Sequence, residues 1–293
     1  MTTTKVTNTI KETRKQVEEW RKAGCTIGFV PTMGFLHEGH KSLIERSVAE
    51  NAKTVVSIFV NPTQFAPTED LASYPKDFTA DSTLCQNAGV DLIFFPAENE
   101  MYPKNAATYV DMTSPITEQL CGKSRPTHFM GVCTVVAKLF NIIPADRAYF
   151  GKKDAQQLAI IRQMVADLNI PIQIIGCPII RERDGLAKSS RNSYLSPEER
   201  QAATIVSKAI FESENMINSG NFTAKQIIAA MHQIIESEPL AKIDYVELVD
   251  MATLLPVPVQ TKIAKVSEKT KPVLAAVAVY IGKTRLIDNF SQV

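Results

Sequence analysis

Apolar and polar residues alternate along the first 178 positions in blocks that predict strands and helices in turn. Short apolar runs rich in β-branched residues predict strands at 26–30, 54–60, 91–95, 147–150 and 172–176. Apolar residues at helical spacing predict helices at 7–23, 40–50, 77–88, 131–142 and 154–168. Strands that are apolar throughout are typical of a parallel sheet covered on both faces. The pattern therefore predicts a doubly wound, Rossmann-like α/β domain.

The pattern changes near residue 178, and we place a domain boundary there, between 1–178 and 179–293. Beyond the boundary, helical spacing predicts helices at 197–218 and 223–236, and apolar runs predict strands at 243–249 and 273–281. This order, with helices first and strands after them, predicts a smaller α+β domain with an antiparallel sheet.

Composition and charge exclude several classes of function. Thirty-two basic residues against 31 acidic ones give a formal net charge of +1, so charge gives no reason to expect a nucleic acid or a membrane surface as partner. The five cysteines are widely spaced without a C-x-x-C pair, which favours reduced thiols over disulfides or a zinc site. A charged amphipathic start and the lack of a long apolar run predict a soluble, cytoplasmic protein.

Residues 31–40, PTMGFLHEGH, lie between a predicted strand and a predicted helix. A glycine turn at a helix start directs backbone N–H groups and the positive end of the helix dipole at one point, which suits a phosphate. His37 and His40 can face the same side of the helix and donate to phosphate oxygens. We prefer this nucleotide site to a structural turn with two surface histidines. Zinc is a poorer alternative because no third ligand stands out.

The segment NPTQF follows the next predicted strand. Its Asn61 and Gln64 offer donors and acceptors without charge, which suits the hydroxyl and carboxylate groups of a small substrate. Taken alone, an Asn-Pro pair indicates only a turn. The placement after a strand of the parallel sheet is what favours a binding site.

Two lysine-containing segments complete the candidate chemistry. In GKKDAQQ, residues 151–157, a lysine can reach a triphosphate, Asp154 can cap the following helix, and Gln157 lies on the same helix face as Asp154. In KSSRN, residues 188–192, two cations flank two hydroxyls. That loop suits a leaving pyrophosphate, although a solvated basic loop would have the same composition.

Taken together, PTMGFLHEGH and KSSR resemble the two signatures of the nucleotidylyltransferase superfamily. A closer resemblance uses six segments in order: PTMGFLHEGH, SIFVNPTQF, RPTHF, FGKKDAQQLAIIRQMV, DGLAKSSRNSYL and RLIDN. They are similar to the successive motifs of the pantothenate synthetase (pantoate-β-alanine ligase) family and span the whole chain. The resemblance implies that ATP and (R)-pantoate form a pantoyl adenylate and pyrophosphate, and that β-alanine then gives pantothenate and AMP.

The resemblance also implies roles for individual residues. His40 is the implied proton donor, and His37, Lys153 and Arg191 are the other implied catalytic residues. The implied ATP site comprises Met33, Gly34, Phe35, Leu36, His37, Glu38, Gly39, His40, Gly151, Lys152, Lys153, Asp154, Ile180, Lys188, Ser189, Ser190 and Arg191. Gln64 and Gln157 would bind pantoate, and Gln64 would also bind β-alanine. Supporting roles fall to Asn61, Tyr74, Asp81, Arg125 and His128.

The resemblance further implies Mg²⁺ with the ATP, a homodimer, a nucleotide- and pantoate-binding domain at 1–178 and a C-terminal lid domain at 179–293. Lys152 stands where the family often has glutamate or glutamine, which concerns fine-tuning of the site. Two rival functions remain. An adenylyltransferase with another acceptor would not explain NPTQF, and a nucleotide sensor without catalysis would not need the intact histidines and cations.

Overall fold

The computed structural model describes residues 4–67, 69–265 and 271–292. Contacts within the chain group it into two compact units. The first unit consists of Met1–Thr113, Arg125–Lys152 and Gln157–Pro178, and the second of Ser114–Ser124, Lys153–Gln156 and Ile179–Val293. Two short segments that precede residue 178 therefore pack with the C-terminal part of the chain.

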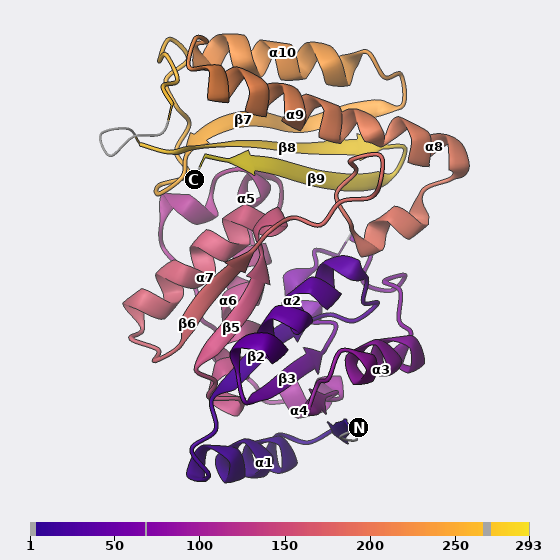
Figure 1. The fold of residues 1–293 in the computed structure, drawn as a ribbon, viewed down its shortest axis with the longest axis vertical. Helices are drawn as coiled ribbons and strands as arrows, with labels where there is room; N and C mark the ends of the chain where they lie inside the picture. Colours follow the sequence, from indigo (N-terminus) through magenta and orange to yellow (C-terminus); the bar gives the residue numbers. More distant parts are fainter. Residues whose placement is uncertain (1–3, 68, 266–270, 293) are drawn as a thin grey trace. The chain divides into compact units, whose positions relative to one another are not determined.

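The first unit is built on a six-stranded parallel sheet with the strand order β1-β4-β3-β2-β5-β6 (Figure 1). Its strands are β1 Lys5–Thr7, β2 Ile27–Thr32, β3 Lys53–Ile58, β4 Leu92–Phe94, β5 Arg147–Gly151 and β6 Gln173–Cys177. The helices in this part of the chain are α1 Ile10–Lys22, α2 Glu38–Glu50, α3 Phe78–Asn87, α4 Glu98–Met101, α6 His128–Ile142 and α7 Ala155–Asp167. Two single turns of 3-10 helix are η1 Pro62–Gln64 and η3 Lys152–Asp154. The doubly wound α/β prediction is confirmed.

The two central strands show why the sheet is covered on both faces. Phe29 and Val30 of β2 are fully buried, and so are Val55 and Val56 of β3. Successive side chains of a strand point to opposite faces, so burial of consecutive residues requires packing on each side. The continuous apolar runs in the sequence arise from this requirement.

The second unit contains a three-stranded antiparallel sheet in the order β7-β8-β9, as expected for an α+β unit. Its strands are β7 Ala241–Asp250, β8 Val273–Ile281 and β9 Thr284–Ser291. Its helices are α5 Cys121–Ser124, α8 Pro197–Ala202, α9 Thr204–Ser219 and α10 Ala224–Glu236, with 3-10 turns η2 Pro115–Thr117 and η4 Ser190–Tyr194. Buried side chains of α9, α10 and β8 form one hydrophobic cluster that includes Ile217, Ile227, Met231 and Val277.

Two predicted helices differ from the structure in detail, and one strand was not predicted. The helix predicted at 7–23 is present as α1, but it begins at Ile10, because Thr9 caps it and Thr7 pairs with Phe94 in the short strand β1. The predicted helix at 197–218 is two helices that meet at Ala203. Strand β9 was not predicted as a strand, because it mixes apolar residues with Arg285, Asp288 and Asn289.

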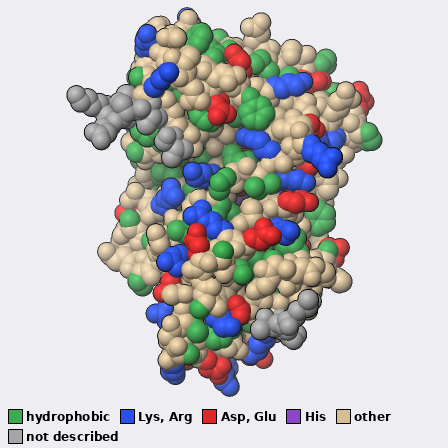
Figure 2. Space-filling model, viewed as in Figure 1, with side chains coloured by type: hydrophobic (Ala, Val, Ile, Leu, Met, Phe, Trp, Pro, Cys, Tyr) green, Lys and Arg blue, Asp and Glu red, His purple; other side chains and the backbone are tan. Residues whose placement is uncertain are grey.

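Basic and acidic side chains are interspersed over the visible face of the molecule (Figure 2), in keeping with the formal net charge of +1. A cationic binding site on that face would therefore consist of a few neighbouring basic side chains and not of an extended basic surface. Among the described residues, no helix has both the length and the apolar character needed to cross a membrane.

Candidate active site

The polar motifs of the first unit gather at the carboxyl edge of its sheet. From β2 the chain continues to β3 and β4 on one side, and it later returns to place β5 on the other side of β2. The strand order therefore reverses between β2 and β5, and ligands of open α/β sheets bind at such a switch point. Residues 33–37 follow β2, residues 61–64 follow β3, and Lys152 follows β5.

The turn after β2 is held by a buried carboxylate. Gly34 and Phe35 have φ values of +89° and +51°, and a Cβ on Gly34 would lie 3.0 Å from both Asp81 and Ile58. Asp81, from α3, accepts hydrogen bonds from the backbone N–H groups of Phe35 at 2.8 Å and Leu36 at 2.6 Å. Burial raises the pKa of Asp81, although these two hydrogen bonds act in the opposite direction. Two amides that the sequence assigned to a phosphate thus bind Asp81 in this structure.

The two histidines of the motif cap α2. His37 is the N-cap residue and its Nδ1 accepts from the N–H of Gly39 at 3.1 Å, while Nδ1 of His40 accepts from the N–H of His37 at 3.3 Å. The ring centroids lie 4.1 Å apart. A neutral imidazole that accepts through Nδ1 carries its proton on Nε2, so this hydrogen-bond pattern assigns an Nε2–H donor to each ring. The structure therefore places two such donors together at the positive end of α2.

Asn61 fixes the segment after β3 and does not offer itself to a ligand. Its side chain is 1% exposed, and its Oδ1 accepts from the hydroxyls of Thr63 at 3.0 Å and Tyr102 at 2.8 Å. Its Nδ2 donates to the carbonyl of Gly131 at 3.2 Å and to Oε1 of Gln64 at 3.1 Å. The four hydrogen bonds of the Asn61 side chain are thus made within the protein, which gives this residue a structural role at the end of β3.

Gln64 links the segments that follow β2 and β3. Its Nε2 contacts the sulfur of Met33 at 3.2 Å, while Asn61 holds its Oε1. Its backbone carbonyl accepts from His128 at 2.9 Å and from Arg125 at 3.2 Å. The structure thus brings together a predicted pantoate residue, a predicted ATP residue and three of the predicted supporting residues.

Two adjacent glutamines of α7 differ in their environment. Gln156 is 5% exposed and its amide bonds to Cys121, Ile116 and Gln119 within the second unit, so it is structural. Gln157 belongs to the first unit and is half-buried, and its side chain makes no hydrogen bond with any described residue. An amide of this kind is suited to a ligand, so Gln157 stays a predicted pantoate residue.

The second unit brings Ile180 next to the KSSR segment. The N–H of Lys188 donates to the carbonyl of Ile180 at 2.9 Å across the turn that joins them. The hydroxyl of Ser189 caps η4 by accepting from the N–H of Arg191 at 3.3 Å, and Ser190 is 8% exposed. The predicted ATP residues of this segment are therefore held as one rigid group.

Partners of opposite charge anchor this group and its neighbours. Lys188 pairs with Glu182 at 2.9 Å. Arg181 binds both carboxylate oxygens of the buried Asp288, at 2.6 and 3.0 Å, and Asn289 donates to the carbonyl of Lys153 at 2.7 Å. The RLIDN motif of β9 therefore supports two predicted ATP segments, a function that its sequence did not reveal.

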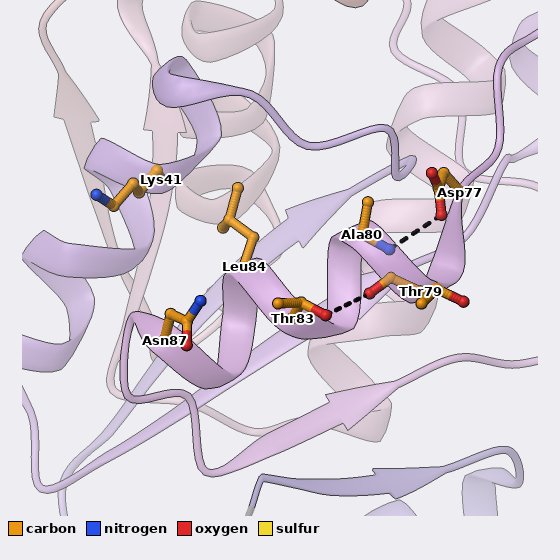
Figure 3. Close-up of a pocket in the computed structure, with 7 residues that line it drawn as sticks. All are labelled: Lys41, Asp77, Thr79, Ala80, Thr83, Leu84 and Asn87. Atoms are coloured by element: carbon orange, nitrogen blue, oxygen red, sulfur yellow. Dashed lines mark hydrogen bonds between the residues drawn. The ribbon is translucent and has the colours of Figure 1, made fainter.

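A separate hollow of about 660 Å³ lies over α2 and α3 (Figure 3). Its lining includes Lys41, Asp77 and Thr83, and none of its side chains belongs to a predicted site. Asp77 caps α3 through the N–H of Ala80, and Thr83 donates to the carbonyl of Thr79. Because these groups serve the helix itself, the hollow has no convergent set of polar groups.

Among the described residues, no three His, Cys, Asp or Glu side chains form a group that could hold a metal ion. Mg²⁺ at nucleotide sites is usually held by substrate phosphates and water with one or two carboxylates. The described residues therefore do not build a cage for such an ion.

A parallel sheet with phosphate-directed and amide-rich segments at its carboxyl edge defines an α/β enzyme that acts on a nucleotide and a small polar substrate. Over residues 5–291 the sequence matches the family described as pantoate-beta-alanine ligase. The chain belongs to this family, whose ATP-dependent reaction joins pantoate and β-alanine to form pantothenate.

Individual relatives agree along the whole length of the chain. Pantothenate synthetase of Ruminiclostridium cellulolyticum is 55% identical, with 98% of each chain covered, and that of Enterococcus faecalis is 56% identical, with 97% of each covered. The crystal structure of pantothenate synthetase from Thermus thermophilus superposes with a TM-score of 0.89 at 42% identity, over 98% of each chain. The crystal structure of the Francisella tularensis ligase, solved with β,γ-ATP and β-alanine, superposes with a TM-score of 0.78. The two sequences are 34% identical, with 99% of this chain and 98% of that chain covered.

Proposed function

We propose that the protein condenses (R)-pantoate with β-alanine at the expense of ATP, through an enzyme-bound pantoyl adenylate. The observation that carries this proposal is the histidine-capped start of α2, with Gln64 joined to the same turn through Met33. Nucleotide and acid segments thus meet at one edge of the sheet. The complex of the Francisella ligase with β,γ-ATP and β-alanine supports the same assignment.

The proposed chemistry fits the residue types. Pantoate is an ionised carboxylate near neutral pH, so its attack on the α-phosphorus of ATP needs no general base. It needs alignment of the two substrates and stabilisation of the charge that builds up on the phosphates. We assign the second task to His37, His40, Lys153 and Arg191. The other residues of the implied ATP site would bind the nucleotide together with these four.

Gln64 and Gln157 are the proposed pantoate residues, and Gln64 is also the proposed β-alanine residue. An amide offers both a donor and an acceptor, which suits the hydroxyl and carboxylate groups of pantoate. It also leaves the carboxylate without a neutralising cation, so the carboxylate keeps its nucleophilicity. Support comes from the half-buried side chain of Gln157, which makes no hydrogen bond with the residues that the structure describes, and from the fixed position of Gln64.

An assay of AMP release tests the proposed function. With ATP, pantoate and β-alanine together we expect AMP in proportion to pantothenate, and with any one left out we expect none. With ATP and pantoate alone, labelled pyrophosphate should exchange into ATP, because the adenylate forms before β-alanine reacts. Exchange that does not depend on pantoate would show instead that the protein is an adenylyltransferase with another acceptor.

Four further features remain proposals from the family resemblance. Mg²⁺ would arrive with the phosphates of ATP. The protein would act as a homodimer in the cytoplasm. Nucleotide and pantoate binding would belong to residues 1–178, with 179–293 serving as the lid domain. Sedimentation of the purified protein tests directly whether it is a homodimer.

A further inference from the structure

A half-buried ion pair lies next to the proposed acid-binding residue, at the carboxyl edge of the sheet. Arg125 donates to both carboxylate oxygens of Glu69, from Nε and Nη2, at 2.6 Å each. The side chains are only 16% and 21% exposed. Burial alone would raise the pKa of Glu69, but the hydrogen bonds and charge of Arg125 hold it below its usual value. The pair is therefore ionised and geometrically fixed.

The same guanidinium orients a histidine. Nη1 of Arg125 lies 3.1 Å from Nε2 of His128. An arginine can only donate, so Nε2 of His128 accepts and the proton of the neutral ring lies on Nδ1. That Nδ1–H points at the backbone carbonyl of Gln64, 2.9 Å away. The tautomer of His128 is thus determined by Arg125.

The carbonyl of Gln64 receives a second hydrogen bond, from Nη2 of Arg125 at 3.2 Å. Two donors saturate a carbonyl oxygen and fix the end of η1 from one side. On the other side, Asn61 holds the side-chain oxygen of Gln64. The backbone and the amide of this residue are therefore oriented by separate groups.

We propose that Glu69, acting through Arg125 and His128, is a positioning residue that fixes the backbone of Gln64 at the place from which its amide binds the acid substrate. The inference rests on the proposed function of Gln64. In this arrangement Glu69 also occupies the edge of the guanidinium that would otherwise bind a carboxylate. Arg125 is then a part of the support and does not bind the acid itself.

Steady-state kinetics of the full-length protein tests the proposal, with pantoate varied at saturating ATP and β-alanine, and ATP varied in turn. Glu69→Gln removes the negative charge of the carboxylate. Arg125→Lys keeps the positive charge but loses the planar set of N–H donors with which the guanidinium binds Glu69, His128 and Gln64 at once. Each should raise the KM for pantoate about tenfold or more, because small displacements of positioning groups have large effects. The KM for ATP should change less than about twofold in both variants, since the nucleotide segments are not supported by this pair.

His128 allows a rescue experiment. His128→Asn places an amide donor where Nδ1 lies, whereas His128→Ala removes the donor. We expect the Asn variant to keep a KM for pantoate near that of the wild type and the Ala variant to raise it. Equal effects of the two substitutions would overturn the role given to the Nδ1–H group.

The matched control is Asp91→Asn, which breaks a similar ion pair, Lys53 with Asp91 at 2.7 Å, with 29% and 17% exposure. It lies at the amino ends of β3 and β4, opposite the site, and should leave both KM values unchanged. If Glu69→Gln behaves like this control, or lowers the KM for pantoate by freeing Arg125, the positioning role is refuted while the proposed function stands. A wild-type protein without pantoate-dependent turnover would refute both.

Discussion

At the residue scale, His37 and His40 each have two functions. Their Nδ1 atoms cap α2, while their Nε2–H groups are the proposed donors to ATP. Replacement by alanine removes both functions, so a loss of activity after that change would not show which one mattered. The geometry suggests a substitution that separates them.

Asparagine places an acceptor oxygen near the position of Nδ1 and has no atom at the position of Nε2. We therefore expect His37→Asn and His40→Asn to keep thermal stability near that of the wild type, while pyrophosphate exchange falls by about 10²–10³. The alanine variants should in addition lose about 0.5–2 kcal/mol of helix-cap stability. Full exchange activity in either asparagine variant would show that its Nε2–H group is not required.

At the element scale, one contact between α6 and η1 positions the acid segment. A Cβ on Gly131 would lie 2.3 Å from the carbonyl oxygen of Thr63 and 2.7 Å from the backbone nitrogen of Gln64. These are backbone atoms, so they cannot turn away as the end of a side chain can. The glycine lets the helix touch the turn that carries Gln64.

This contact predicts an unusual result for Gly131→Ala. In an exposed helix the change would add about 1 kcal/mol of stability. Here we expect a net loss of about 1–3 kcal/mol, because the added methyl forces the two backbones apart. The KM for pantoate should rise with it as Gln64 moves. Urea unfolding and steady-state kinetics measure the two effects, and a stabilised variant with normal kinetics would contradict the contact.

Most helices and strands could be predicted from the sequence. The contacts between side chains that are distant in sequence could not. The buried runs of β2 and β3 could be identified because continuous apolar strands have one physical explanation, burial on both faces. Strand β9 could not, because the charge of its buried Asp288 is paired with Arg181, 107 positions away. The roles of Asn61 and Glu69 depend in the same way on residues distant in sequence. Such pairs leave no periodic signal.

At the scale of the whole molecule, burial keeps most of the cysteines unreactive. It raises the pKa of Cys85 to about 12 and that of Cys133 to about 11, and it also raises the pKa of Cys177. Cys121 is buried as well, and Cys25 is the partly exposed one. Since the thiolate is the reactive form, both access and charge protect the buried thiols.

We accordingly expect a single thiol of the native protein, Cys25, to react readily with a disulfide reagent at pH 8. All five should react after denaturation, because the sequence contains five cysteines. A Cys25→Ser variant serves as the control and should show almost no fast reaction. Two or more fast thiols in the native wild type would mean that the cores open more easily than their packing indicates.

The position of β2 in the sheet also has a consequence for folding during synthesis on the ribosome. Its partner β5 is far along the chain: the N–H of Ile27 donates to Asp146 across 119 positions, next to the paired residues of the two strands. During synthesis, one edge of β2 stays open until all of the intervening chain has left the ribosome. An open strand edge is a template for unwanted pairing. Among the four inner strands of this sheet, β2, which leads into residues 31–40, therefore waits longest for its second neighbouring strand.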